Sequence, residues 1–462
     1  MVIKNGDALG AVGDVAARKV ALEVAEAVLQ SLDAHRVLRG LLHLEGDTLR
    51  FGNRRWELRT KRRIYVVGAG KAANAMARAV EEVLGDRITR GLVIVKRLEP
   101  ADRLRRIELA AAGHPLPNAD GLLASRRILE IVDQASPDDL LIGLISGGSS
   151  ALMTCPVPGI SIEDERQVTE VLLQSSARIL EINAVRRHIS AINGGRLTQK
   201  VEAQGAEMIN FIISDSVGHT PTRDPTQPAT FFGTPVAPDS TTLQDARNVL
   251  EKYRLTSRIP RTILEFLRKA TPADETPKAF SSRVHLFVLE RPADACEAAR
   301  RAAQEMGLAA CVLTTQLEGE SCEAGTFLAC VAKEVALNRR PVAAPCLLIA
   351  GGETTTRIEG PCGEGGPSQE LALGFALEVA GRRGFCLAAL DTDGTDGPTD
   401  MAGGLADGTS VERAREKGLD VYQCLRAHDS STVLQAAGDA IRTGNTGTNV
   451  CDLNIIYVSG ES

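Results

Sequence analysis

The sequence predicts an α/β protein of two α/β domains with mainly parallel sheets, and three observations support this prediction. The chain has 462 residues, whereas one hydrophobic core rarely serves more than about 250 to 300. Short apolar runs alternate with helical patterns along nearly the whole chain, as they do in βαβ units. Several runs end in Gly, Ser, Asp or Thr, so polar loops should follow the carboxyl ends of the strands, where open parallel sheets bind ligands.

Apolar runs of strand length mark the expected buried strands. They cover residues 63–70, 91–96, 140–148, 208–215, 285–290, 309–315, 346–352, 385–394 and 453–458. An amphipathic helix is expected from about Asp14 onward. Segment 220–242 is rich in Pro and Thr and has no periodicity, which indicates a functional loop beside a domain junction. The boundary is predicted near residue 245, giving domains of residues 1–245 and 246–462.

The composition is that of a soluble globular protein, with 44% hydrophobic and 24% charged residues, and it argues against disordered and membrane classes. A net charge of −6 argues against a nucleic-acid partner. The first residues do not show the unbroken apolar core and small-residue cleavage site typical of a signal peptide, and no run approaches the roughly 18 apolar residues of a membrane helix. The ten cysteines form no C-x-x-C pair, so we expect reduced thiols in a cytoplasmic protein.

A glycine-rich turn follows the first strand in the segment "YVVGAGKAANAMARAV". Gly68, Gly70 and Ala73 fit the G-x-G-x-x-A form of the dinucleotide fingerprint. The acidic partner expected about 20 residues later is missing, and Lys96 and Arg97 end the next strand instead. These cations would suit the 2′-phosphate of NADP, so the fingerprint alone leaves a nucleotide-dependent oxidoreductase open.

Lys71 lies inside this turn. The first amides of the following helix already favour an anion there, and the lysine adds a full positive charge. The position suits a transferring phosphoryl group or a substrate carboxylate; the alternative is a lysine that merely caps an exposed turn. A Walker A pattern is absent, which excludes a P-loop NTPase.

A second candidate anion site lies at the end of the strand "LLIGLI", in the turn Ser146-Gly147-Gly148-Ser149-Ser150. Two glycines let the backbone approach a ligand, and hydroxyls and helix-terminal amides supply hydrogen bonds. The pattern favours a phosphate cradle. A nucleophilic serine is the rival interpretation, but the G-x-S-x-G elbow is missing and no histidine is obviously placed for a triad.

Downstream, "EINAVRRHISAINGGRL" reads as a helix followed by a Gly-Gly turn. Asn183, Arg186 and Arg196 are candidates for holding a carboxylate, since arginine binds carboxylates and phosphates bidentately. Arg187 is expected to be solvated, and His188 to be a packing or capping residue.

Acidic residues follow two of the expected strands. Asp215 ends the strand "INFIIS", where it is placed to hold Mg²⁺ or to accept a hydroxyl proton. The stretch "DTDGTDGPTD" has four aspartates but not the spacing of an EF-hand loop. Asp391 and Asp400 are expected to cap the turn, whereas Asp393 and Asp396 are candidates for a metal or a substrate hydroxyl.

Taken together, these motifs resemble the class II glycerate kinases, which are glycerate 2-kinases with a carboxyl-terminal MOFRL domain. The resemblance covers roughly residues 15–458 and rests on nine ordered segments: "GAGKAA", "AGHPLPNADG", "LISGGSSAL", "EINAVRRHISAINGGRL", "ISDSVG", "AGGETTT", "GGPSQELAL", "DTDGTDGPTDMAGG" and "TGTNVCDLNI". It implies phosphorylation of D-glycerate at its 2-hydroxyl, with ATP and Mg²⁺, to give 2-phosphoglycerate. It also implies a Rossmann-like first domain (1–245), a MOFRL-type second domain (246–462), an active-site cleft between them, and a monomer or homodimer.

The resemblance and the motifs give the expected site residues. Those expected in catalysis are Lys71, Asp215 and Asp393. Those expected to bind substrate are Ser149, Asn183, Arg186, Arg196, Asp396 and Asn449. Those expected to bind ATP are Gly68, Gly70, Ser146, Gly147, Gly148, Ser150, Gln369 and Glu370, with Glu353 and Asp393 as metal ligands.

One departure from the family bears on the substrate. The usual "GGRNQE" reads "GGPSQE" here, so Pro367 replaces an arginine. The loss of that arginine would lower the rate, alter the substrate, or be offset by Arg357. A kinase for a related small hydroxy acid, an NAD(P)H-dependent hydroxypyruvate reductase, and a catalytically silent binding protein therefore stand as alternatives.

Overall fold

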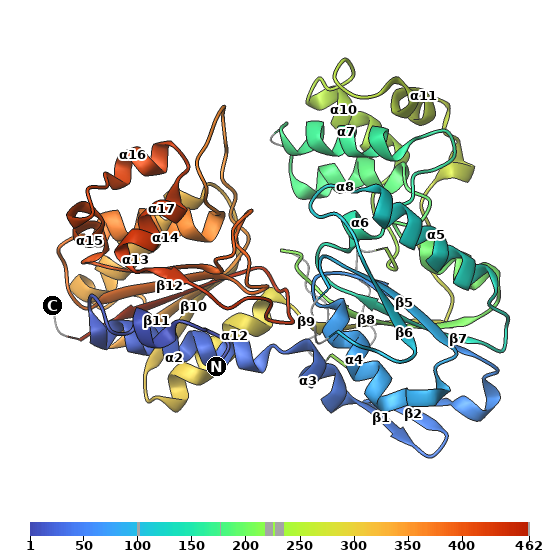
Figure 1. Ribbon diagram of the computed structural model, residues 1–462, viewed down its shortest axis with the longest axis horizontal. Helices are drawn as coiled ribbons and strands as arrows, with labels where there is room; N and C mark the ends of the chain where they lie inside the picture. The colour runs from blue at the N-terminus through green and yellow to red at the C-terminus, as the bar shows by residue number, and fades with distance from the viewer. Residues whose placement is uncertain (99–101, 176, 218–224, 227–234, 461–462) are drawn as a thin grey trace. The chain divides into compact units, whose positions relative to one another are not determined.

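The structure is a computed structural model that describes residues 1–98, 102–175, 177–217, 225–226 and 235–460 (Figure 1). The chain forms two compact units. The central unit consists of Ala34–Ser214 and His219–Leu289, and the terminal unit consists of Met1–Asp33, Asp215–Gly218 and Glu290–Ser462.

The central unit contains a small and a large sheet with helices around them. Its strands are β1 (Leu42–Glu45), β2 (Thr48–Phe51), β3 (Arg54–Glu57), β4 (Ile64–Ala69), β5 (Arg90–Val95), β6 (Ile107–Ala111), β7 (Leu140–Ile145), β8 (Glu207–Ile213) and β9 (Val284–Glu290). Its helices are α3 (Ala34–Leu41), α4 (Ala73–Leu84), α5 (Ala119–Asp133), α6 (Ser149–Leu152), α7 (Ile162–Leu173), α8 (Ile179–His188), α9 (Arg196–Ala203), α10 (Leu243–Lys252) and α11 (Arg261–Lys269), with 3₁₀ turns η1 (Leu58–Thr60), η2 (Gly85–Arg87) and η3 (Pro272–Asp274).

The large sheet has the strand order β6-β5-β4-β7-β8-β9, and each pairing from β6 to β8 is parallel. The predicted α/β class is therefore confirmed, and all predicted strands of this unit are present. Because the order reverses between β4 and β7, the two loops that leave these strands diverge to opposite sides. Doubly wound sheets bind ligands at such a switch point.

Both faces of this sheet are covered, which explains why its strands are continuous apolar runs. Helices α5 and α9 bury one face, in a core that includes Val67, Ile94 and Ile145. On the other face Phe51 of β2 contacts Phe211 and Phe287, with ring centroids 4.9 and 4.7 Å away. Helices α7, α8, α10 and α11 form a separate apolar cluster (Figure 1).

Glu207, at the start of β8, joins three parts of this unit through its carboxylate. Its carboxylate accepts hydrogen bonds from Trp56 Nε1 at 2.9 Å and from Lys61 Nζ at 2.7 Å, and it lies 3.1 Å from His285 Nε2. Burial opposes its ionisation, but these bonds outweigh burial and lower the pKa of Glu207 to about 2.

Replacing Glu207 with Gln is expected to destabilise the protein at pH 7 by about 1–3 kcal/mol. Since the folded pKa lies below the ordinary 4.5, the carboxylate contributes its full stability above about pH 5 and loses it as the pH falls toward 2. Urea unfolding of both proteins between pH 3 and 7 tests this. The difference between them should shrink as the pH falls, and a constant difference would contradict it.

The terminal unit contains one sheet between two helical layers. Its strands are β10 (Ala309–Leu317), β11 (Cys346–Gly352), β12 (Phe385–Asp391), β13 (Gly403–Asp407), β14 (Ala440–Ile441) and β15 (Asp452–Val458). Its helices are α1 (Gly6–Leu9), α2 (Val15–Ser31), α12 (Pro292–Glu305), α13 (Ser321–Asn338), α14 (Pro367–Val379), α15 (Ser410–Glu416), α16 (Val421–Arg426) and α17 (Ser430–Ala437).

This sheet has the order β10-β11-β15-β12-β13-β14 and is mixed. Only β10 and β11 pair in parallel, and the other four pairings are antiparallel. The expectation of mainly parallel sheets therefore does not extend to this unit. The physical reason is connection length: residues 392–402 join β12 to β13 directly, and an antiparallel pair needs no crossover helix.

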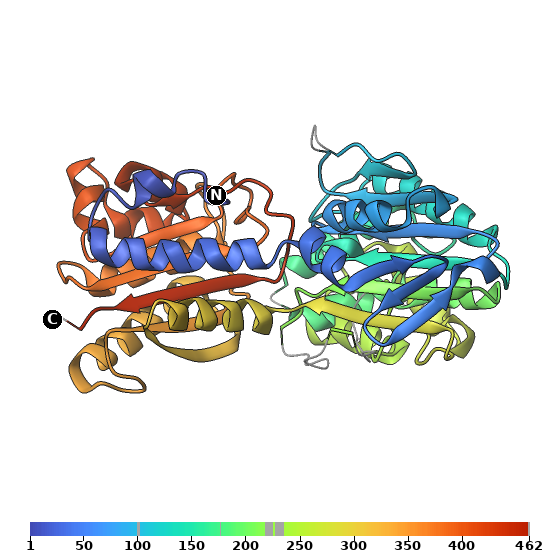
Figure 2. The same ribbon diagram turned by 90° about the horizontal axis from the view of Figure 1, so that it is seen from below.

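Helices α2 and α12 lie on one face of the sheet, on either side of β15 (Figure 2), and α13 and α14 cover the other. Helix α2 confirms the predicted amino-terminal helix, and Asp14 caps it by accepting a hydrogen bond from Ala17 N at 3.2 Å. None of the helices in the described part of the chain has the length and apolar character needed to cross a membrane.

The units do not divide at the boundary predicted near residue 245. Helices α10 and α11 share an apolar core with α7 and α8, so they belong to the central unit. Helix α2 packs on β12 and β15 and belongs to the terminal unit. Most of the predicted functional loop 220–242 lies outside the described residues.

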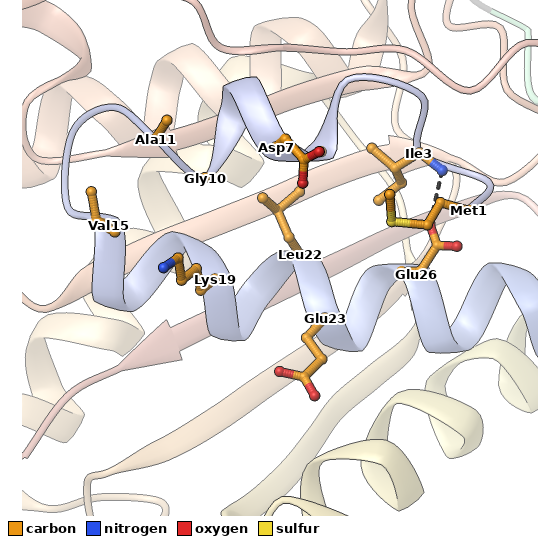
Figure 3. A pocket seen from close by; sticks show the side chains of 11 residues that line it. Met1, Ile3, Asp7, Gly10, Ala11, Val15, Lys19, Leu22, Glu23 and Glu26 are labelled. Atoms are coloured by element: carbon orange, nitrogen blue, oxygen red, sulfur yellow. Dashed lines mark hydrogen bonds between the residues drawn. The ribbon is translucent and has the colours of Figure 1, made fainter.

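A pocket of about 540 Å³ lies beside α1 and α2 (Figure 3). Apolar side chains such as Ile3 and Leu22 line it, and none of the expected site residues does. The Glu26 carboxylate accepts hydrogen bonds from the amides of Val2 and Ile3 at 2.7 and 2.8 Å. These bonds hold the first residues of the chain against α2.

Candidate functional site

The turns that follow β4 and β7 pack directly on each other. Lys71 N donates a hydrogen bond to Gly147 O at 2.9 Å, and Ser146 Oγ accepts one from Ala72 N at 2.9 Å. A Cβ atom on Gly70 would lie 2.1 Å from Ser146 Oγ. Packing between the two turns therefore explains this glycine without a dinucleotide.

The same contacts assign a structural task to Ser146, which is 2% exposed. Its hydroxyl satisfies an amide at the start of α4, a helix that has no side-chain cap of its own. We therefore interpret Ser146 as joining the two turns rather than as contacting ATP directly.

Lys71 and His114 both lie against Gly148. A Cβ atom on Gly148 would be 2.9 Å from Nε2 and Cδ2 of His114 and 3.4 Å from Cγ of Lys71. Gly148 also has a φ of +81°, which favours glycine. The expected cradle therefore has a histidine beside it, which the sequence alone did not indicate.

The short helix α6 that follows the cradle is held in place by hydrogen bonds from the "AINGG" turn. Asn193 Nδ2 donates to Ser150 O at 3.3 Å and to Met153 O at 3.1 Å. In addition, Ala191 N donates to Cys155 O at 2.7 Å. The third and fourth expected motifs of the chain are thus parts of one structure.

Arg186, on α8, carries the clearest sign of a missing anion. Its Nε and Nη2 atoms are buried and have no hydrogen-bond partner among the described residues. Burial lowers the pKa of Arg186, and Glu165 opposes this only in part. A buried guanidinium without partners is costly, so a carboxylate or phosphate ligand would relieve a real penalty here.

The other residues of this motif separate into two groups. Arg196 Nη2 donates to Asp274 O at 2.6 Å, while its Nε is buried without a partner. Asn183 is partly exposed, one turn before Arg187. Arg187 itself is only 5% exposed and pairs with Asp239 at 2.9 Å, so the expectation that it is solvated is wrong.

His188 is buried, as expected of a packing residue. Its Nδ1 lies 2.7 Å from Ala184 O, and its Nε2 lies 2.6 Å from Glu275 Oε1. Both ring nitrogens are therefore engaged within the protein.

In the terminal unit, acidic residues gather where strands β11 and β12 end and the neighbouring strand β15 begins. Asp452 is the register partner of Asp391 on one side and of Gly352, which precedes Glu353, on the other. Burial, and then the charges of Asp391 and Glu353, raise the pKa of Asp452 well above its ordinary value. The position therefore favours a cation or a proton.

The loop after β12 begins with a tight acidic turn. Asp391 Oδ1 accepts a hydrogen bond from Asp393 N at 3.0 Å, which fits its expected role in the turn. Asp393 is 4% exposed and accepts hydrogen bonds from the amide and hydroxyl of Thr395 at 2.7 and 2.8 Å. Asp400 is exposed and pairs with Arg442.

Asp396 has a structural role that sequence analysis missed. Its carboxylate accepts hydrogen bonds from Ser368 N at 3.1 Å and Gln369 N at 2.9 Å, at the start of α14. It is 2% exposed, and burial raises its pKa to about 7. Asp396 therefore caps α14, and we no longer assign it to the substrate.

Gln369 is fully buried by the same arrangement. Its Nε2 donates to Asp396 O at 3.3 Å and Thr399 Oγ1 at 3.1 Å, and its Oε1 accepts from Ser431 Oγ at 2.7 Å. We interpret it as fixing the acidic loop on α14 rather than as contacting nucleotide.

Glu370 is the next residue of this motif, and it pairs with His428 Nδ1 at 2.9 Å. Pro367 opens α14 at a position that proline favours. Arg357 is 71% exposed and pairs with Glu359 at 2.7 Å, so nothing in its contacts indicates that it replaces the family arginine.

The last expected motif meets Asp215. Asn449 Nδ2 donates to Asp215 Oδ2 at 3.3 Å, and Cys451 Sγ donates to Asp215 O at 2.7 Å. The structure thus joins Asp215 to the loop before β15, although more than 200 residues separate them in the chain.

A metal site is not preformed. Among the described residues, no group of three or more His, Cys, Asp and Glu side chains is arranged to hold a metal ion. Mg²⁺ is usually held by one or two carboxylates together with substrate phosphates and water. The carboxylates at the ends of β11, β12 and β15 meet that smaller requirement.

Two family models match the chain. One, described as a domain of unknown function (DUF4147), matches residues 20–268. The other, the MOFRL family, matches residues 346–452.

Curated proteins and a solved structure match nearly the whole chain. A glycerate 2-kinase of Pyrococcus horikoshii is 37% identical over 96% of this chain and 98% of its own. A D-glycerate 2-kinase of Thermotoga maritima is 40% identical over 85% and 90%. A crystal structure of a Thermotoga maritima glycerate kinase matches with a TM-score of 0.76 and 36% identity, covering 95% of this chain and 99% of that one.

The reductase alternative also has a counterpart among these proteins. An Agrobacterium vitis protein is 38% identical over 87% of this chain and 88% of its own, and it is named a putative hydroxypyruvate reductase.

Proposed function

The chain belongs to the glycerate kinase family, and we propose that it transfers the γ-phosphoryl group of ATP to the 2-hydroxyl of D-glycerate, giving 2-phosphoglycerate and ADP. The observation that carries this proposal is the Arg186 guanidinium, two of whose nitrogens are buried without a partner in the part of the chain that the structure describes. It lies in the same unit as the Lys71 and Gly148 turns at the sheet's switch point. The carboxylate or phosphate groups of the substrates would satisfy the two Arg186 nitrogens.

In the proposed reaction, the 2-hydroxyl oxygen bonds to the γ-phosphorus while the bond to the β,γ-bridging oxygen breaks. Such a step needs positioning and charge neutralisation more than covalent catalysis. Lys71 neutralises charge on the transferring group, and the turn from Gly147 to Ser150 holds phosphate oxygens. Arg186 and Arg196 hold the glycerate carboxylate, aided by Asn183.

The remaining expected site residues are carboxylates, and their chemistry suits proton acceptance and metal binding. Asp215, oriented by Asn449, accepts the proton of the attacking hydroxyl. Asp393 and Glu353, beside Asp391 and Asp452, would hold Mg²⁺. When bound, Mg²⁺ would offset phosphate charge. Burial, and then the charges of Asp391 and Glu353, raise the pKa of Asp452, and a cation bound nearby would offset these effects.

A substrate panel tests the proposed function. Purified protein with ATP and Mg²⁺ should release ADP with D-glycerate, and ³¹P NMR should identify 2-phosphoglycerate and not the 3-phosphate. EDTA should abolish turnover and added Mg²⁺ should restore it. ADP release with another hydroxy acid but not with glycerate would replace glycerate as the substrate, and no release in any arm would favour a silent binding protein.

The reductase alternative has its own measurement. Hydroxypyruvate and NADPH are incubated with the protein while nicotinamide absorbance is followed. The packing of Gly70 on Ser146 already explains part of the dinucleotide fingerprint, so we expect no enzyme-dependent oxidation.

A further inference from the structure

We propose that His114 is a further ligand of the transferring phosphoryl group, which it binds together with Lys71. The proposal rests on the proposed function of this chain as a kinase, and it adds a residue from the "AGHPLPNADG" motif, to which the mechanism above assigns no task.

The first argument is the place of the imidazole. Nε2 and Cδ2 of His114 are the atoms nearest to where a Cβ on Gly148 would lie, both at 2.9 Å, and Cγ of Lys71 is next at 3.4 Å. The polar edge of the ring and the stem of the lysine therefore approach the same glycine, in the middle of the cradle. An anion placed over Gly148 meets both side chains.

The second argument is that the loop holding His114 is anchored on both sides. Asn118 Oδ1 accepts hydrogen bonds from Gly113 N and from Gly121 N, each at 3.0 Å, so the loop is tied to the start of α5. Helix α5 in turn packs closely on α6, since a Cβ on Gly121 would lie 2.8 Å from Leu152 O. His114 is thus held to the helix that begins at the cradle.

The third argument is chemical. A phosphoryl group in flight spreads negative charge over three oxygens, and stabilisation comes from donors already in place. Lys71 contributes an ammonium group. The imidazole of His114 contributes an N–H donor that approaches the phosphoryl oxygens from a different direction. A histidine that is partly exposed also remains accessible to a ligand, unlike the buried His188.

The test compares His114→Ala, His114→Asn and a control, His43→Ala, which removes an exposed histidine from β1 of the same unit. We expect His114→Ala to lower kcat about 10- to 100-fold with little change in KM for D-glycerate. His114→Asn, which keeps an N–H donor, should recover part of the loss. Binding of the β,γ-imido analogue of ATP, measured by calorimetry, should weaken in His114→Ala but not in His114→Asn or in the control His43→Ala.

Several outcomes would overturn the proposal. Wild-type kcat and analogue affinity in His114→Ala would do so, as would a rise in glycerate KM alone, which would assign His114 to the carboxylate. If the alanine variant fails to fold, His114→Asn decides: because this variant should recover only part of the loss, a folded His114→Asn protein with fully wild-type kcat refutes the phosphoryl contact. An inactive wild type would instead refute the proposed function itself.

Discussion

Lys71→Met is expected to lower kcat for glycerate phosphorylation by about 100- to 1000-fold while leaving the fold intact. Methionine keeps most of the length and apolar stem of lysine, so its contact with Gly148 is retained. What disappears is the positive charge beside the two packed turns. Because charge develops on the phosphoryl group in the transition state, the loss should affect kcat more than the KM for glycerate.

The matched control is Lys269→Met, which removes an exposed lysine at the end of α11 in the same unit. Steady-state kinetics of both variants, with circular dichroism and thermal unfolding to verify folding, provide the measurement. Equal kcat in Lys71→Met and the control would reduce Lys71 to a lysine that caps a turn.

Local patterns predicted the secondary structure well because a buried strand consists largely of apolar residues, which are visible in the sequence. The run 140–148, for example, corresponds to β7, which is buried along its whole length. Strand β6 was missed because its residues are only partly buried. The unit boundary was misplaced because α2 is covered by strands more than 350 residues later, and no local pattern reports such a partner.

The roles of site residues were predictable when they depended on neighbouring residues in the sequence. They were not predictable when the side chain forms hydrogen bonds with the backbone of a distant segment. The glycine turns lie together as their position at strand ends predicts. The capping role of Asp396, by contrast, was missed because an aspartate in a loop looks the same in the sequence whether it faces a ligand or caps a remote helix such as α14. His114 was overlooked for the opposite reason: its motif was recognised, but only the fold brings it to Gly148.

Buried charge fixes α2 on the terminal unit. Arg18 is fully buried, and its guanidinium pairs with Asp407 and Asp439. It also donates to Leu9 O at 3.1 Å and Leu405 O at 3.2 Å. Burial opposes ionisation of Asp407. The charge of Arg18 and further hydrogen bonds outweigh this effect of burial and lower the pKa of Asp407 to about 2. Arg18 therefore compensates two carboxylates that have little access to water.

Arg18→Met is accordingly expected to destabilise the protein by about 3–5 kcal/mol, because it leaves buried carboxylates without their main counter-charge. Urea unfolding provides the measurement, and Lys19→Met, one residue further along α2 but exposed, provides the control. Arg413 also pairs with Asp439, so part of the charge remains balanced. Of its ion pairs with described residues, Asp407 would keep only its longer contact with Arg413, at 3.5 Å. Arg18→Met combined with Asp407→Asn should therefore cost less than the sum of the two single changes, by about 0.5–3 kcal/mol. Strict additivity would mean that Arg18 stabilises α2 through packing alone.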